Sequence, residues 1–138
     1  MTPTIGIIKR KEDNYLENYV KAVNAFGAKA LLLDNTSSEE TIFDMLKSLD
    51  GIIFTGGSSW EVVDELILEH CLNNKIPFLG ICLGLQLMFE SSEEGPGVKG
   101  LGLLPGKIVK FPEKEGFKIP HMGWNSIDVK EGSRLFKG

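Results

Sequence analysis

A cysteine between two glycines is the residue of this sequence best suited to act as a nucleophile. It is the centre of the run Gly80-Ile81-Cys82-Leu83-Gly84, where an apolar stretch gives way to a helical pattern. A strand that turns sharply into a helix forms a nucleophile elbow, which raises the central side chain and leaves no room for bulky neighbours. The helix N-terminus favours a thiolate, and the N–H of Leu83 can donate to a developing oxyanion. We predict that Cys82 is a catalytic nucleophile; the alternative is a small core cysteine.

A glycine pair closes the preceding apolar stretch, in the run Thr55-Gly56-Gly57-Ser58. Without Cβ atoms, Gly56 and Gly57 would let the backbone approach a substrate and offer a second oxyanion donor. Ligands of open α/β sheets bind outside the carboxyl ends of the strands, so we expect this run to lie beside Cys82. Taken alone, the run is better explained as a tight turn before a helix, with Ser58 opening a capping box.

The other reactive side chains form no second site by their spacing. Cys71 falls on the apolar stripe of a predicted helix and is expected in the core. The two histidines, His70 and His121, are not paired in the sequence with an acid that would orient a catalytic base. The cysteines and histidines also lack metal-ligand spacing, and no phosphate-binding loop is present. We therefore expect neither a metal nor a cofactor.

The elements that must position these residues alternate along the chain. Apolar runs predict buried strands at residues 5–8, 30–33, 51–54 and 76–81, with amphipathic helices between them and after the last one. Such alternation indicates right-handed crossovers and a parallel sheet covered on both faces. Shorter strands are expected near residues 108–109 and 126–129. The predicted fold is a three-layer, doubly wound, mostly parallel α/β sheet of flavodoxin-like type, in a single domain over residues 1–138.

Composition excludes several classes of protein. Hydrophobic residues make up 42% and charged residues 25% of the 138, which is typical of a globular domain. A net charge of −4 disfavours a nucleic-acid partner, and no apolar run is long enough to cross a membrane. Two cysteines without a regular framework, and an N-terminus without a signal pattern, lead us to expect a cytoplasmic protein.

The segment Gly80–Gln86 (GICLGLQ) resembles the elbow of class I (triad-type) glutamine amidotransferases. Three further segments are similar to the glutaminase subunit of imidazole glycerol phosphate synthase, an enzyme of histidine biosynthesis: Phe89–Glu94 (FESSEE), Gly100–Gly106 (GLGLLPG) and Pro120–Asn125 (PHMGWN). The resemblance is close from about Lys75 onward, whereas the residues before it agree only in architecture.

This resemblance implies a glutaminase that hydrolyses glutamine to glutamate and ammonia through a γ-glutamyl thioester on Cys82. The N–H groups of Gly57 and Leu83 would form the oxyanion hole, and Gly56, Gly57 and Gln86 would bind the substrate. The ammonia would pass to a cyclase-type synthase subunit, so the implied assembly is a heterodimer with lyase activity in the synthase reaction.

A loop near the C-terminus is predicted to contact this partner. Pro120 and Gly123 bracket the loop, and exposed Trp and Met side chains on loops are typical interface anchors. In the resembled family this segment meets the synthase. We therefore expect a partner interface beside the mouth of the active site, formed by His121, Met122, Trp124 and Asn125. A buried Trp124 in the core is the alternative.

The sequence departs from the resembled subfamily in two loops. Lys9–Glu12 replaces an Asp-Tyr-Gly-type loop, and Thr55–Ser58 replaces a Pro-Gly-Val-Gly run. A paralogous amidotransferase serving another synthase, or a non-catalytic flavodoxin-like module that binds a partner, therefore stays open. A cysteine-elbow protein acting on aldehydes or peroxides is disfavoured, because such chemistry needs neither Gln86 nor Trp124. The family's catalytic His and Glu follow the position of Gly138, so we expect this chain alone to be an inactive N-terminal portion.

Overall fold

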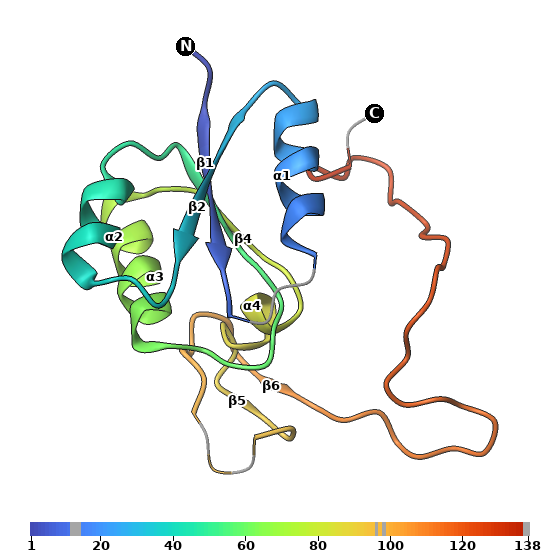
Figure 1. Cartoon of the computed structure of the whole chain (residues 1–138). Coiled ribbons are helices and arrows are strands. Elements are labelled where there is room, and N and C mark those ends of the chain that lie inside the picture. The colour runs from blue at the N-terminus through green and yellow to red at the C-terminus, as the bar shows by residue number, and fades with distance from the viewer. Residues whose placement is uncertain (12–14, 96, 98, 137–138) are drawn as a thin grey trace.

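Four parallel strands form the central sheet of the computed structural model, which describes residues 1–11, 15–95, 97 and 99–136 (Figure 1). The strand order is β2-β1-β3-β4. Their bounds are β1 (Thr4–Lys9), β2 (Lys29–Asp34), β3 (Gly51–Phe54) and β4 (Phe78–Gly80). In register, Ile5 of β1 pairs with Ala30 on one side and Gly51 on the other. This order confirms the predicted doubly wound, flavodoxin-like sheet.

Helices lie on both faces of the sheet (Figure 1). Helix α1 (Leu16–Ala25) covers one face, while α2 (Glu39–Leu46) and α3 (Val62–Asn74) cover the other. The short helix α4 (Leu83–Gln86) follows β4 directly. The main core lies on the α2/α3 face and consists of Ile8, Leu33, Ile42, Leu46, Leu49, Ile52, Phe54, Ile67, Leu68, Cys71 and Met88.

Helix α3 begins later than the sequence predicts. Its N-cap is Glu61, and the carboxylate of Asp64 accepts a hydrogen bond from the N–H of Glu61 at 2.8 Å. The predicted capping box opened by Ser58 is therefore wrong. The buried carboxylate of Asp64 is fixed by other polar groups, so the first turn forms around that side chain.

The region after α4 forms a small second sheet. Strands β5 (Ser91–Ser92) and β6 (Lys107–Ile108) pair in parallel. Glu93 ties them together, because its carboxylate accepts hydrogen bonds from the N–H of Lys110 and from Nζ of Lys107. These bonds hold the pKa of Glu93 below its ordinary value, the Lys110 N–H having the largest effect.

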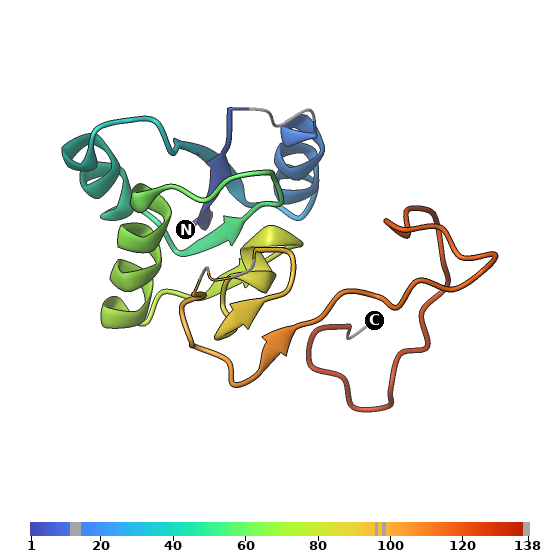
Figure 2. The same cartoon turned by 90° about the horizontal axis from the view of Figure 1, so that it is seen from below.

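The remaining residues loop away from the sheet (Figures 1 and 2). No strand forms in the described residues after β6, so the strand predicted at 126–129 is wrong. Ile127 and Val129 are instead exposed. Alternation of apolar and polar residues stabilises a strand only when a neighbouring strand pairs with it, and the structure provides none there.

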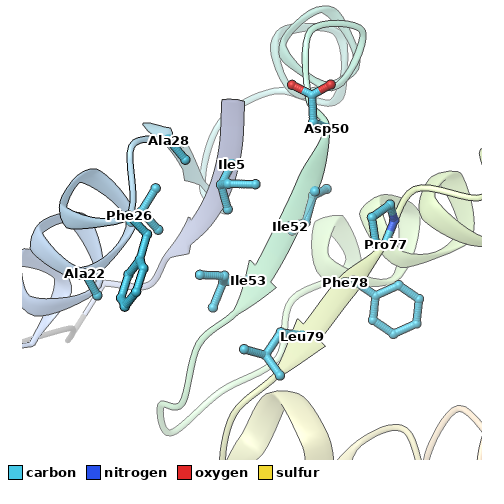
Figure 3. A pocket seen from close by; sticks show the side chains of 12 residues that line it. Ile5, Ala22, Phe26, Ala28, Asp50, Ile52, Ile53, Pro77, Phe78 and Leu79 are labelled. Carbon is cyan, nitrogen blue, oxygen red and sulfur yellow. The ribbon is translucent and has the colours of Figure 1, made fainter. Parts of the chain in front are cut away.

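An apolar groove of about 480 Å³ opens between α1 and β4 (Figure 3). Ile53 and Leu79 point into it, and 44% of Leu79 is exposed, although parallel sheets are normally covered on both faces. Gly51 at the start of β3 and Pro77 before β4 also line it, so it lies toward the amino ends of the strands. Ligands of this kind of fold bind at the opposite edge. None of the helices within the described ranges has the length and apolar character needed to span a membrane.

Candidate active site at the Cys82 elbow

The backbone turns sharply between β4 and α4, and Cys82 stands at the turn. Its φ of 52° and ψ of −115° lie in a region that side-chain-bearing residues rarely adopt. The N–H of Ile81 donates to the carbonyl of Phe54 at 2.9 Å, and the N–H of Gln86 donates to the carbonyl of Cys82 at 2.9 Å. These bonds hold the strained turn, and the thiol is exposed. The chain thus has the backbone of an elbow, while the nucleophilic role of Cys82 stays a prediction.

Two glycines let the elbow pack tightly. A Cβ on Gly84 would overlap the carbonyl oxygen of Phe54, and one on Gly80 would lie 2.6 Å from the carbonyl oxygen of Gly84. A side chain is therefore excluded at Gly80 and Gly84 by the close contact of α4 with β3 and β4, in addition to any crowding of Cys82 itself. Both contacts are with backbone atoms, which cannot move aside as a flexible side chain can.

The glycine pair at the end of β3 lies against the elbow. A Cβ on Gly56 would come within 3.2 Å of Cβ and 3.7 Å of Sγ of Cys82. Gly57 follows with a φ of 149°, a conformation that favours glycine. Within the described residues, no acceptor takes a hydrogen bond from the N–H of Gly57 or Leu83. Both N–H groups are therefore available to donate to a new partner, as the donors of an oxyanion hole must be. The oxyanion-hole role of Gly57 and Leu83 stays a prediction.

The other predicted site residues fall into two groups. Gln86 lies on α4 one turn after Cys82, within reach of the same edge. His121, Met122, Trp124 and Asn125 all lie in the exposed segment that loops away from the sheet, so the structure does not bring them to the elbow. Trp124 is fully exposed, which excludes the core alternative in this structure. The partner interface stays a prediction.

Cys71 and the histidines occupy the places that a non-catalytic role predicts. Cys71 is fully buried in α3, and burial raises the pKa of its thiol to about 11. His70 lies against the ring of Phe43 with ring centroids 6.1 Å apart, and His121 is exposed. In the described part of the chain, neither histidine is hydrogen-bonded to Cys82, and no three His, Cys, Asp or Glu side chains cluster as metal ligands would.

A buried ion pair near the glycine pair was missed by the sequence analysis. Arg10 directly follows β1 and is only 4% exposed, and its Nη1 lies 2.9 Å from Oδ2 of the fully buried Asp64. The sequence indicates only its position, because Arg10 directly follows β1, the neighbour of β3, at the edge where ligands bind; its burial depends on residues far away in the chain. By sequence alone, the charged run of residues 9–12 is only a departure from a family loop. Glu12 of that run lies outside the described residues.

Known proteins are similar to this chain over nearly its whole length. A family model described as "Glutamine amidotransferase class-I" matches residues 10–138. The chain is 41% identical over 140 residues to imidazole glycerol phosphate synthase subunit HisH of Methanocaldococcus jannaschii. This match covers 97% of the present chain and 66% of the relative. The protein of the same name from Methanothermobacter thermautotrophicus is 37% identical over 134 residues, with the same two coverages.

A third relative of that name, from Desulfitobacterium hafniense, is 38% identical over 142 residues, or 97% of this chain and 63% of the relative. The chain therefore spans about two thirds of the length of these three curated relatives. The family match contains the Cys82 elbow, the glycine pair and the strands that carry them. This chain belongs to the class-I glutamine amidotransferase family.

Proposed function

We propose that this chain carries the nucleophile of a glutaminase that converts glutamine and water to glutamate and ammonia. The observation that carries the proposal is the exposed Cys82 thiol on a strained elbow, with the Gly56 backbone against it. Strain of this kind is retained where the surrounding structure holds it, and it is frequent at active sites. Family membership supports the amide of glutamine as the electrophile.

The reaction divides into two acyl-transfer steps. The Cys82 thiolate attacks the side-chain amide carbon of glutamine, so that an S–C bond forms and the carbonyl electron pair moves to oxygen. The N–H groups of Gly57 and Leu83 donate to this oxyanion. As the carbonyl re-forms, the C–N bond breaks and the nitrogen takes up a proton and leaves as ammonia. Water then attacks the thioester, which releases glutamate and restores the thiol.

A base must accept the proton from the thiol and return it to the leaving nitrogen. His70 packs against Phe43 on α2, and His121 lies on the exposed segment, so neither is suited to this role. The resembled family takes its His and Glu from residues that follow the position of Gly138. We therefore propose that full turnover needs that additional segment, and that this chain alone has little or none.

The ammonia acceptor is proposed to be a cyclase-type synthase subunit of histidine biosynthesis. The three relatives are named as subunits of imidazole glycerol phosphate synthase, which supports that assignment. The exposed Trp124 and Met122 would supply apolar anchors for a cytoplasmic heterodimer. A paralogous amidotransferase for another synthase is the second candidate, favoured by the Thr55–Ser58 loop, whose sequence differs from the subfamily pattern.

The proposal is tested by measuring glutamate release from glutamine, using a longer protein that continues past Gly138 and the imidazole glycerol phosphate synthase cyclase subunit. We expect turnover in that complex, loss of turnover with Cys82→Ser, and unchanged turnover with Cys71→Ser as the matched control. Turnover that survives Cys82→Ser would refute the nucleophile assignment. Glutaminase activity that the cyclase subunit neither binds nor stimulates would favour the paralogue.

A further inference from the structure

The loop after β3 carries Gly57, the proposed oxyanion donor. Hydrogen bonds hold both ends of this loop, one to β1 and one to Arg10, which directly follows β1. On one side, Oγ1 of Thr55 donates to the carbonyl of Ile8 at 2.9 Å, and Thr55 is fully buried. On the other side, Nη1 of Arg10 donates to the carbonyl of Ser59 at 2.7 Å. The three residues between these anchors include Gly57, whose N–H has no acceptor within the described chain.

Arg10 is itself held by a buried polar network. Its Nη1 contacts Oδ2 of Asp64 at 2.9 Å, and the same carboxylate oxygen accepts hydrogen bonds from Nδ2 of Asn35 at 3.3 Å and from the N–H of Glu61 at 2.8 Å. The guanidinium carbon also lies 5.4 Å from the ring centroid of Trp60. A side chain restrained on so many sides cannot easily change rotamer, so its bond to Ser59 is a rigid anchor.

The Arg10 side chain also sets the path of Gly57. A Cβ on Gly57 would lie 2.5 Å from Cδ and 3.3 Å from Nε of Arg10, so the aliphatic stem packs directly on the backbone that presents the N–H. Nε and Nη2 of Arg10 have no hydrogen-bond partner among the described residues, although both are buried. Leaving two buried N–H groups unpaired costs folding free energy, which is unusual for a guanidinium that only stabilises the fold. A well-packed apolar pair would stabilise the fold as well.

We propose that Arg10, held by Asp64, is a positioning residue that keeps the N–H of Gly57 aimed at the oxyanion formed on attack by Cys82. This inference rests on the proposed glutaminase function. Oxyanion stabilisation depends on donors that are fixed before the reaction, because a mobile donor must be reoriented as the charge develops. Arg10 touches no reacting atom and acts through the backbone of residues 57–59.

Two variants loosen the anchor in different ways. Arg10→Lys keeps the positive charge beside Asp64, but a single ammonium group cannot reproduce the planar fork between Asp64 and Ser59. The double variant Arg10→Met/Asp64→Leu removes both charges together, so no unpaired charge stays buried. Lys9→Met is the matched control, because it breaks an ion pair of the same strand with Asp34 that lies at the surface.

The first measurement is the backbone ¹⁵N order parameter from NMR relaxation, after circular dichroism has shown that each variant is folded. The order parameters of residues 57–59 should fall below about 0.6 in both Arg10 variants, while those of the core residues of β1 and β3 stay near about 0.85. Lys9→Met should leave the order parameters of residues 57–59 unchanged.

The second measurement separates positioning from a structural role. A chloromethyl ketone analogue of glutamine alkylates a thiol through an adduct whose oxygen carries negative charge, whereas iodoacetamide reacts by direct displacement without one. The ratio of the two alkylation rates at Cys82 therefore reports oxyanion stabilisation and cancels differences in thiolate content. We expect this ratio to fall at least about tenfold in both Arg10 variants, since removal of one oxyanion donor lowers rates by about 100-fold or more.

The outcomes are distinct. Lower order parameters at residues 57–59 together with a lower ratio support the proposal. A ratio within about twofold of the wild type in a folded variant overturns it, whether or not the order parameters fall, because the pair would then only stabilise the fold. If the wild-type chain itself shows no preference for the glutamine ketone over chloroacetone, the glutaminase proposal fails and the role of Arg10 fails with it.

Discussion

The two cysteines differ so strongly in environment that one alkylation experiment can decide which is the reactive thiol. Cys82 is exposed at the elbow, whereas Cys71 is fully buried in α3. We predict that brief treatment of the folded chain with iodoacetamide modifies Cys82 and leaves Cys71 intact. The perturbation is chemical, so it depends neither on a catalytic base nor on a partner.

The size of the difference follows from burial. Desolvation raises the pKa of Cys71 from an ordinary value of 9.0 to about 11. At a pH of about 8, two pKa units lower its thiolate fraction by about 100-fold relative to an unperturbed thiol. Reaction through an open state, in which the thiol is solvated and its pKa is no longer raised, is slowed separately by a factor of about 100 if opening costs about 3 kcal/mol. We therefore expect Cys82 to react at least about 100-fold faster.

Peptide mapping by mass spectrometry after timed quenching gives both rates from one sample. Cys82→Ser should remove the fast modification, and Cys71→Ser should leave it unchanged. Both cysteines should be modified at similar rates in denaturant, which shows that the selectivity belongs to the fold. Comparable rates at Cys71 and Cys82 in the folded chain would refute the assignment of the reactive thiol and with it the elbow as the active site.

Three further predictions concern stability. Gly84→Ala should lower the free energy of unfolding by about 3 kcal/mol or more, because the added Cβ overlaps the backbone of β3. Leu85→Ala, at an exposed neighbouring residue, should lower it far less, and equal shifts in melting temperature would contradict this prediction. Trp124→Ala should change stability by no more than about 0.5 kcal/mol but weaken binding to a cyclase subunit; a large loss of stability would show that Trp124 is core. Hydrogen bonds from Lys9 first, and then from the hydroxyl and N–H of Thr36, lower the pKa of Asp34 from 3.8 to about 2, so these contacts contribute stability above pH 3.8 that is lost as the pH falls toward 2. Since the side chains of Lys9 and Asp34 are partly exposed, Asp34→Asn should remove less than about 1 kcal/mol, in chemical denaturation followed over that pH range.

The sheet could be predicted from the sequence because its strands are buried on both sides. Runs such as Gly51–Phe54 have no polar interruption, and such a run between helical patterns fits a parallel strand in a covered sheet. Right-handed crossovers with helices on both faces predict a doubly wound sheet, and the observed order β2-β1-β3-β4 is one of the orders that this architecture allows. The residues that pack under α2 and α3 follow from helical spacing alone, as Ile42 and Leu46 show.

Local signals failed where long-range contacts decide the outcome. Ser58 and Glu61 fit a capping box by spacing, but the helix starts after Glu61 because Asp64 is held by Arg10, which is 54 residues away. The strand predicted at 126–129 has suitable alternation, yet no neighbour pairs with it in the structure. Periodicity describes what a segment could bury and not whether a partner surface is present.

The candidate active site likewise has a part that local sequence signals predict and a part that depends on long-range contacts. The Cys82 elbow could be predicted because its constraints are local: a strand end, a helix start and two glycines within five residues. The meeting of Gly56 with Cys82 needed one further step, the rule that parallel strands present their carboxyl ends at one edge. Arg10 was beyond reach, because its burial depends on a carboxylate from α3, an amide from the end of β2 and a carbonyl from the loop after β3. A charged residue in a loop is normally solvated, and only the assembled edge of the sheet shows that this one packs on Gly57, the residue after the glycine that lies against Cys82. The chemistry of the site is thus encoded in one short run, whereas the rigidity that the chemistry needs is distributed over the fold.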